Sequence, residues 1–256
     1  MKSGALGNYI DVAQVVLYLF WIFFAGLLYY LHRENKREGY PLEHDNGSRK
    51  VVQGWPAVPK AKIFRLRDGT TRSSPPVASI EPPLNATASN RSLGTPLDPK
   101  GDPMLAAVGP GSYAMRADVP DMTYDGHPKL VPLRVATDFH LESADPDPRG
   151  MTVFGADGVA GATVKDAWVD RAEYILRYLE LEIKSNDGLE RILLPMTFAR
   201  IASGRVTVNA IHGHQFVNVP RTKGAESITL LEEEKVMAYY GGGTLYADPS
   251  RMEPLA

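Results

Sequence analysis

The chain has 256 residues, a formal net charge of -2 at pH 7 and no cysteine. The missing thiols exclude disulfides, thiolate nucleophiles, iron–sulfur clusters and cysteine-ligated structural zinc. A net charge so close to zero gives no electrostatic basis for binding nucleic acid, which requires a basic face. The mean hydropathy of -0.21 is that of a soluble protein, but it averages over one extreme segment.

Residues 12–31 form that segment and read VAQVVLYLFWIFFAGLLYYL, without a single charged side chain. A helix rises about 1.5 Å per residue, so this stretch spans about 30 Å, the thickness of a bilayer core. A cleaved signal peptide is the alternative, but only Lys2 precedes the run as a basic residue and no small-residue cleavage site follows it. The sequence therefore predicts a retained transmembrane helix.

The basic residues beside this helix predict its orientation. Arg33, Lys36 and Arg37 follow the apolar run, whereas Lys2 alone precedes it. Short loops rich in lysine and arginine stay in the cytoplasm, so residues 1–11 are expected in the periplasm and the rest in the cytoplasm. Four residues are expected at the lipid–water interface: Tyr29, Tyr30, Arg33 and Arg37.

Proline dominates the next segment, residues 32–110. Eleven of the 20 prolines lie between Pro41 and Pro110, and proline is excluded from helix interiors and central strands. The segment is either a free linker or an extended chain packed on partner subunits. Recurring apolar residues such as Trp55 and Phe64 favour the second interpretation, with a short hairpin over Lys62–Thr71 that turns at Asp68-Gly69.

Residues 111–256 show short apolar runs at intervals of about ten residues, which favour a small antiparallel barrel or sandwich. The Ala156-Asp157-Gly158 turn indicates a hairpin. Strands are expected over Thr152–Phe154, Ala162–Val169, Ile175–Ile183, Arg191–Leu194 and Arg205–Val208. Only Leu230–Tyr239 has a helical pattern, with acidic residues early, as the helix dipole prefers.

Several blocks of sequence, spread over nearly the whole chain, carry a family resemblance. They include Phe20-Trp21-Ile22-Phe23, Arg37-Glu38-Gly39-Tyr40-Pro41-Leu42, Gly101-Asp102-Pro103-Met104, Asp147-Pro148-Arg149-Gly150, Arg177-Tyr178-Leu179-Glu180 and Glu233-Glu234-Lys235-Val236. In order, spacing and total length they resemble the H subunit of the purple-bacterial photosynthetic reaction centre. Residues from about Asp147 to Val219 also resemble the PRC-barrel module.

The resemblance implies a fold: a single N-terminal transmembrane helix plus a mostly-β cytoplasmic domain, a PRC-type barrel with one short C-terminal helix. It implies an accessory subunit, not an enzyme, in the bacterial inner (intracytoplasmic or chromatophore) membrane. The chain would dock on the L and M subunits, which bind bacteriochlorophyll, bacteriopheophytin, quinones and a non-haem iron, while itself binding no cofactor directly. Further expected partners are the light-harvesting 1 α/β ring, a cytochrome subunit and membrane lipids, but no nucleic acid.

Proton delivery to the secondary quinone is the chemistry that the resemblance assigns to side chains. Such a route needs groups that titrate near the working pH, which are histidines or carboxylates shifted by burial or by neighbouring charge. The resemblance implies a surface entry at Asp125 and His127, with Asp125 standing where some relatives have a second imidazole. It implies an inner part at Asp170, Glu173 and Arg177. The expected route is Asp121, Asp125, His127, Lys129, Asp170, Glu173 and Arg177.

Plainer interpretations stay open for these residues. Asp125-Gly126-His127-Pro128 is also good chemistry for a solvated turn, and Glu173 with Arg177 could be a surface ion pair. His212 and His214 have ligand-like spacing, but two imidazoles without a third ligand make a poor metal site. We therefore expect a polar loop there and no metal.

Two rival functions remain at this stage. A membrane-anchored enzyme would need a nucleophile motif, a metal triad or a dinucleotide fingerprint, and the sequence has none; Gly241-Gly242-Gly243 lacks the context of a phosphate loop. The other rival is a membrane-anchored PRC-barrel adaptor that recruits a soluble partner. It explains the helix and the barrel, but not the proline-rich segment.

Overall fold

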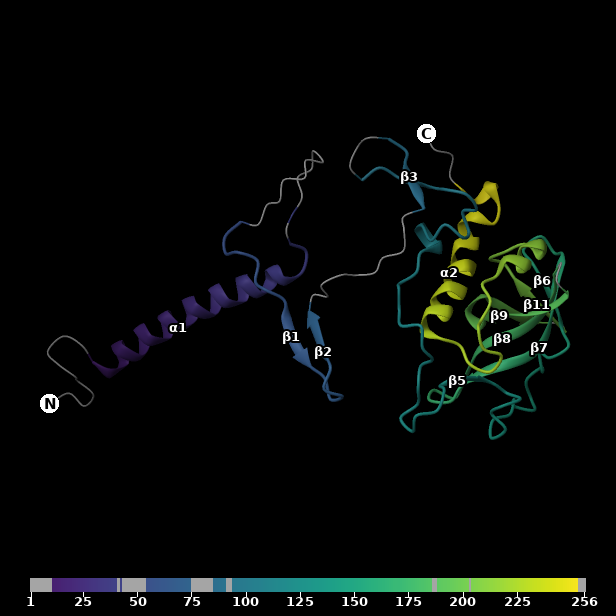
Figure 1. Ribbon diagram of the computed structural model, residues 1–256, viewed down its shortest axis with the longest axis horizontal. Helices are drawn as coiled ribbons and strands as arrows, with labels where there is room; N and C mark the ends of the chain where they lie inside the picture. Colours follow the sequence, from purple (N-terminus) through teal and green to yellow (C-terminus); the bar gives the residue numbers. More distant parts are fainter. Residues whose placement is uncertain are drawn as a thin grey trace. The chain divides into compact units, whose positions relative to one another are not determined.

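The computed structural model describes residues 11–40, 42, 54–74, 85–90, 94–185, 188–202 and 204–252 (Figure 1). The chain divides into two compact units. The first unit, residues 1–79 and 92–94, begins with helix α1 (Val12–Glu34). Asp11 caps this helix by accepting a 2.8 Å hydrogen bond from the backbone N–H of Gln14. One short 3-10 turn, η1 (Asn35–Arg37), follows.

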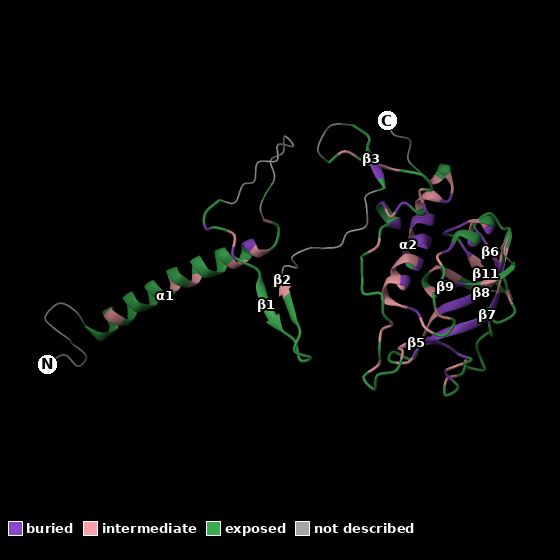
Figure 2. Ribbon diagram, viewed as in Figure 1, coloured by how far each residue is buried: buried purple, intermediate pink, exposed green. Residues whose placement is uncertain are grey.

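Helix α1 has the length and composition of a membrane span. Together with η1 it forms a stretch of 26 residues, Val12–Arg37, in which the most apolar 18 residues have a mean hydropathy of 2.0 and none of them is buried. Figure 2 shows the helix exposed along nearly its whole length. Contiguous apolar surface of this extent is unfavourable in water and favourable in a bilayer core. The prediction of one long apolar N-terminal helix is confirmed.

Polar contacts hold the chain that follows helix α1 close to the end of the helix. Lys36 is 4% exposed and donates a 2.8 Å hydrogen bond from Nζ to the carbonyl oxygen of Pro56. Glu34 binds Arg37 at 2.8 Å and Lys62 at 2.6 Å. These contacts hold the start of strand β1 (Lys62–Arg65) near the end of α1.

Strand β1 pairs antiparallel with β2 (Thr71–Ser74). Asp68 closes the turn, because its Oδ1 accepts a 2.9 Å hydrogen bond from the backbone N–H of Thr70. Gly69 adopts φ +84°, which only glycine reaches without strain. The hairpin predicted at Asp68-Gly69 is confirmed.

The second unit holds the β domain. A small ladder joins β3 (Ala86–Ala88) to β4 (Leu97–Pro99), and η2 (Gly109–Gly111) follows. The main sheet has the order β10-β11-β6-β7-β8-β9, with β5 also paired to β7. Its strands are β5 (Leu130–Pro132), β6 (Thr152–Phe154), β7 (Ala160–Asp170), β8 (Ile175–Ser185), β9 (Gly188–Pro195), β10 (Ala199–Ala202) and β11 (Arg205–Val208).

The five strands predicted from alternation are confirmed within a few residues at their ends. One pairing departs from an all-antiparallel barrel, since β11 runs parallel to β6. The sheet curls into a half barrel, and the register shifts twice between β7 and β8. Such bulges increase the local twist and so help a sheet to curl.

Helix α2 (Leu230–Tyr246) packs against this sheet (Figure 1). Val236, Tyr239 and Tyr240 of α2 belong to the same buried core as Trp168 and Leu179. Thr229 caps the helix in a reciprocal capping box with Glu232. Short 3-10 turns η3 (Met196–Phe198), η4 (Gly213–Asn218) and η5 (Pro249–Arg251) complete the unit.

The helix runs seven residues past the predicted end at Tyr239, straight through Gly241-Gly242-Gly243. Glycine inside a helix costs about 1 kcal/mol relative to alanine, so the triplet suggests a helix end. The structure shows why it is tolerated. A Cβ on Gly241 would lie 2.7 Å from the carbonyl oxygen of Pro110, and one on Gly243 would lie 2.5 Å from Ile211. The glycines let α2 lie directly against neighbouring backbone.

Candidate functional site

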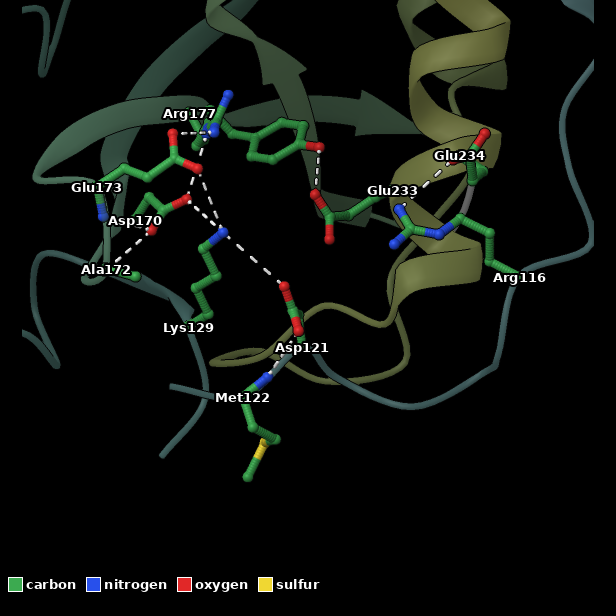
Figure 3. Close-up of polar contacts among 11 residues, drawn as sticks. Arg116, Asp121, Met122, Lys129, Asp170, Ala172, Glu173, Arg177, Glu233 and Glu234 are labelled. Atoms are coloured by element: carbon green, nitrogen blue, oxygen red, sulfur yellow. Dashed lines mark hydrogen bonds and ion pairs between the residues drawn. The ribbon is translucent and has the colours of Figure 1, made fainter. Parts of the chain in front are cut away.

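The candidate site is a cluster of charged groups where β7 ends, β8 begins and α2 starts (Figure 3). Asp170 is the last residue of β7, and Glu173 lies in the tight turn that leads to Arg177 on β8. Strand β5 follows directly after Lys129, and its first residue pairs with Asp170. The register of three neighbouring strands thus brings Lys129 to the turn.

Asp170 is the buried anchor of the cluster, only 1% exposed. Its Oδ1 accepts 3.0 Å hydrogen bonds from the backbone N–H groups of Ala172 and Glu173, which fixes the turn. Its Oδ2 lies 3.4 Å from both Lys129 Nζ and Arg177 Nε. A buried carboxylate needs this many partners, because an unpaired buried charge is very costly.

Lys129 contacts three carboxylates at once. Its Nζ lies 3.4 Å from Asp170, 3.4 Å from Glu173 and 3.9 Å from Asp121. Burial opposes the charge on this ammonium, but Asp170 and Glu173 outweigh burial and raise the pKa of Lys129 above its ordinary value. Lys129 is therefore a fixed positive charge at neutral pH.

Glu173 differs from Asp170 in exposure. Its side chain is 49% exposed, and Oε2 accepts a 2.5 Å hydrogen bond from Arg177 Nη2. The surface ion pair expected from the sequence is therefore present, but it is continuous with the buried Asp170 through both Lys129 and Arg177. A half-exposed carboxyl can exchange protons with bulk water and still contact buried groups.

A further carboxyl, that of Glu233, lies on the α2 side of the cluster. The Tyr178 hydroxyl donates a 3.0 Å hydrogen bond to Glu233 Oε2. Burial raises the pKa of Glu233, although Tyr178 and the cations Arg116 and Arg177 oppose the shift. Burial and Glu233 together raise the pKa of Tyr178 far beyond its ordinary range, so this hydroxyl keeps its proton. The pocket has a volume of about 490 Å³, and Asp121, Lys129, Asp170 and Glu233 all line it.

Five residues of the predicted route are joined by direct contacts: Asp121, Lys129, Asp170, Glu173 and Arg177. Asp125 and His127 are exposed on the turn that precedes Lys129, between the bridged residues Met122 and Pro128. Among the described residues, no recorded contact joins their side chains to the cluster. Their role as an entry stays a prediction.

Asp166, a further carboxylate on β7, belongs to a different network. It pairs with Arg134 at 3.1 Å, and Arg134 also binds the buried Glu180 at 2.7 Å. The reasoning from sequence missed Tyr178 and Glu233 as site residues. They are 55 positions apart in the chain, and only the packing of α2 on β8 brings them together.

Comparison with known families distinguishes a reaction-centre subunit from a membrane-anchored PRC-barrel adaptor. Residues 4–135 match the family described as the photosynthetic reaction centre H-chain N-terminal region, and residues 141–215 match the PRC-barrel domain. The first match covers helix α1 and the proline-rich segment, and a PRC-barrel adaptor leaves the proline-rich segment unexplained. The chain belongs to the reaction-centre H-chain family. Membership implies association with the L and M subunits of a membrane complex that carries pigments and quinones.

Proposed function

We propose that this H chain stabilises the L and M subunits, shields their quinone sites from water and conducts protons from the cytoplasm toward the secondary quinone. The L and M subunits supply the pigments, quinones and non-haem iron, so electron transfer belongs to them. What this chain contributes is binding surface, exclusion of water and titratable side chains. The proposal also includes the light-harvesting 1 ring, a cytochrome subunit and lipids as neighbours.

Exposed apolar groups in the first unit support the docking role. Trp55 is 78% exposed, Ile63 75% and Phe64 51%; Ile63 and Phe64 lie on β1, all four residues of which are exposed, and Trp55 lies in the segment before it. Large exposed apolar groups gathered on one segment indicate a surface that a partner covers. We propose that residues 32–110 pack on L and M, that α1 spans the bacterial inner membrane, and that the β domain is cytoplasmic.

The observation that carries the proton role is the continuous chain of contacts around Lys129. Glu173 and Asp121 reach solvent, Asp170 is buried beside them, and Glu233 lies in the same pocket with a raised pKa. A carboxyl whose pKa is raised toward neutrality can take up and release a proton at working pH. The path would enter at Asp125 and His127, pass Asp121 and Glu173, and continue inward past Arg177.

The test uses flash-induced electron transfer in the intact complex. Glu173→Gln removes a titratable group and keeps nearly the same shape, so we expect the second electron transfer to the secondary quinone to slow, because it is coupled to proton uptake. The first electron transfer should change little. Glu142→Gln is the matched control, because Glu142 is exposed and lies outside the cluster.

The entry is tested with the double variant Asp125→Asn, His127→Gln. It should slow the same step increasingly as pH rises, because free protons become scarce. A small imidazole-type buffer should partly restore the rate, which a structural fault would not allow. An unchanged second-electron rate in the triple variant of Glu173, Asp125 and His127, from neutral to alkaline pH, would leave this chain as a structural cap.

A further inference from the structure

A second cluster of ligand-type side chains lies on unit 2, on elements that the proton route does not use. Among the described residues, Asp157, His212 and His214 form one group in which the ligand atoms all lie within 4.8 Å of one another. Asp157 comes from the turn between β6 and β7, whereas the two histidines lie at the start of η4. The third ligand that the sequence lacked beside His212 and His214 is therefore supplied by a turn 55 residues earlier.

The two segments that carry these ligands are locked together by their backbones. The N–H of Ala156 donates a 2.8 Å hydrogen bond to the carbonyl oxygen of Ile211. Glycines make the approach possible. A Cβ on Gly155 would lie 2.3 Å from the backbone nitrogen of Gly213, and a Cβ on Gly213 would lie 2.6 Å from the carbonyl oxygen of Val159. The backbone that carries the ligands is therefore already ordered before an ion binds.

Asp157 is held in a fixed orientation. Its Oδ1 accepts hydrogen bonds from the backbone N–H groups of Val159 at 3.1 Å and Gly213 at 3.0 Å. Both recorded hydrogen bonds use Oδ1, so Oδ2 is left to bind a cation.

The histidines have an arrangement that suits the same purpose. His212 is half-buried, and its backbone N–H donates a 2.8 Å hydrogen bond to the side chain of Gln215, which fixes the start of η4. The rings of His212 and His214 lie 5.9 Å apart between centroids. A carboxylate of Asp248 lies 3.8 Å from Nε2 of His212. Carboxylates beside metal-ligating imidazoles commonly accept the N–H of the nitrogen that does not bind the ion.

We propose that Asp157, His212 and His214 form a binding site for a divalent transition-metal ion, with Zn²⁺ as the best-suited probe, and that Asp248 orients His212. Two imidazoles and one carboxylate favour zinc and similar ions over Mg²⁺ and Ca²⁺, which prefer oxygen ligands alone. The ion fastens the β6–β7 turn to η4. Because the site is open to solvent, water completes its coordination.

The test is titration of the full-length, untagged, metal-free chain in detergent with Zn²⁺ by calorimetry, and with Co²⁺ by visible absorption. We expect saturable binding of about one ion per chain at this site and a rise in melting temperature with Zn²⁺. Mg²⁺ should produce neither. The Co²⁺ spectrum should report nitrogen and oxygen ligands.

Variants locate the ion. Asp157→Asn keeps an oxygen for the two backbone donors, so the turn stays folded, while His214→Gln removes an exposed ligand. Each should weaken Zn²⁺ binding at least about tenfold, and Asp248→Asn should weaken it by about 10-fold, as is typical when the carboxylate that orients a metal-binding imidazole is lost. His140→Gln, an exposed histidine elsewhere in the unit, is the control and should bind as the parent does. Zn²⁺ affinity that survives both Asp157→Asn and His214→Gln, or no binding by the parent, overturns the proposal.

Discussion

Asp170 and Glu173 contact the same two cations, yet the structure predicts a much larger loss of stability when Asp170 is neutralised than when Glu173 is. Asp170→Asn removes a charge that is 1% exposed and lies 3.4 Å from Lys129 and 3.4 Å from Arg177. At an effective dielectric constant of about 20, one such contact amounts to about 5 kcal/mol of Coulomb energy before desolvation and screening. The net effect on stability is smaller, because desolvation of the carboxylate and solvent around Arg177 both reduce it.

Asparagine still offers an oxygen to the two backbone donors of the turn, so those hydrogen bonds survive. What is lost is the charge-assisted part, and hydrogen bonds to charged groups contribute about 1.5–3 kcal/mol. We expect Asp170→Asn to lower the free energy of unfolding of the β domain by about 2–3 kcal/mol. Glu173→Gln should lower it by less than about 1 kcal/mol, because Glu173 is half-exposed and exposed ion pairs contribute little.

The ionisation of Lys129 makes the loss of stability in Asp170→Asn depend on pH. Its pKa is raised in the folded chain above 10.5, so its contribution to stability is complete below pH 10.5 and is lost as pH rises through the folded pKa. Removing the Asp170 charge removes much of that shift. The difference in stability between the parent and Asp170→Asn should therefore shrink above about pH 10.5.

The assay is urea unfolding of the full-length chain in detergent, followed by fluorescence. Trp168 lies in the buried core of the β domain, so its emission shifts when the domain unfolds. Urea series at pH 7 and at about pH 11 give the difference in unfolding free energy between the parent and Asp170→Asn at each pH. Equal stability of Asp170→Asn and the parent at pH 7, or a Glu173→Gln variant as unstable as Asp170→Asn, would refute the assignment of Asp170 as the anchor.

Two further changes test other contacts. Glu180 is 2% exposed and accepts hydrogen bonds from Trp168 Nε1 at 2.9 Å and from Arg134 and Arg191 at 2.7 Å each. Glu180→Leu leaves these donors without an acceptor, so it should lower the free energy of unfolding in urea by about 3–5 kcal/mol. A loss below about 1 kcal/mol would contradict this. Tyr178→Phe removes a donor that lowers the pKa of Glu233, so the pH profile of the second electron transfer should move to higher pH; an unmoved profile would take Glu233 out of the route.

Local patterns in the sequence were enough for helix α1 and for five of the seven strands of the main sheet, but not for β5, β10 or the site as a whole. The uncharged run of 20 residues predicts α1, and Asp-Gly turns predict both hairpins, because these features depend on neighbouring residues. The end of α2 was missed, since the glycines after Tyr239 serve contacts with Pro110 and Ile211 that lie far away in the chain. The Glu233–Tyr178 hydrogen bond and the approach of Asp157 to His212 were out of reach for the same reason.

The contacts around Lys129 also suit Asp170 and Glu173 to different tasks: one carboxyl keeps a fixed charge, and the other can change its charge when a proton passes. Four donors face the two oxygens of Asp170, and protonation of that carboxyl would remove the charge that pairs with Lys129 and Arg177. Glu173 shares those cations but is half in solvent, so its protonation leaves Asp170 to keep Lys129 and Arg177 in place. A relay needs one member that changes its charge and one that does not, because otherwise each passing proton would loosen the path. In the proposed route we therefore expect Glu173 to carry the moving proton and Asp170 to keep the geometry fixed.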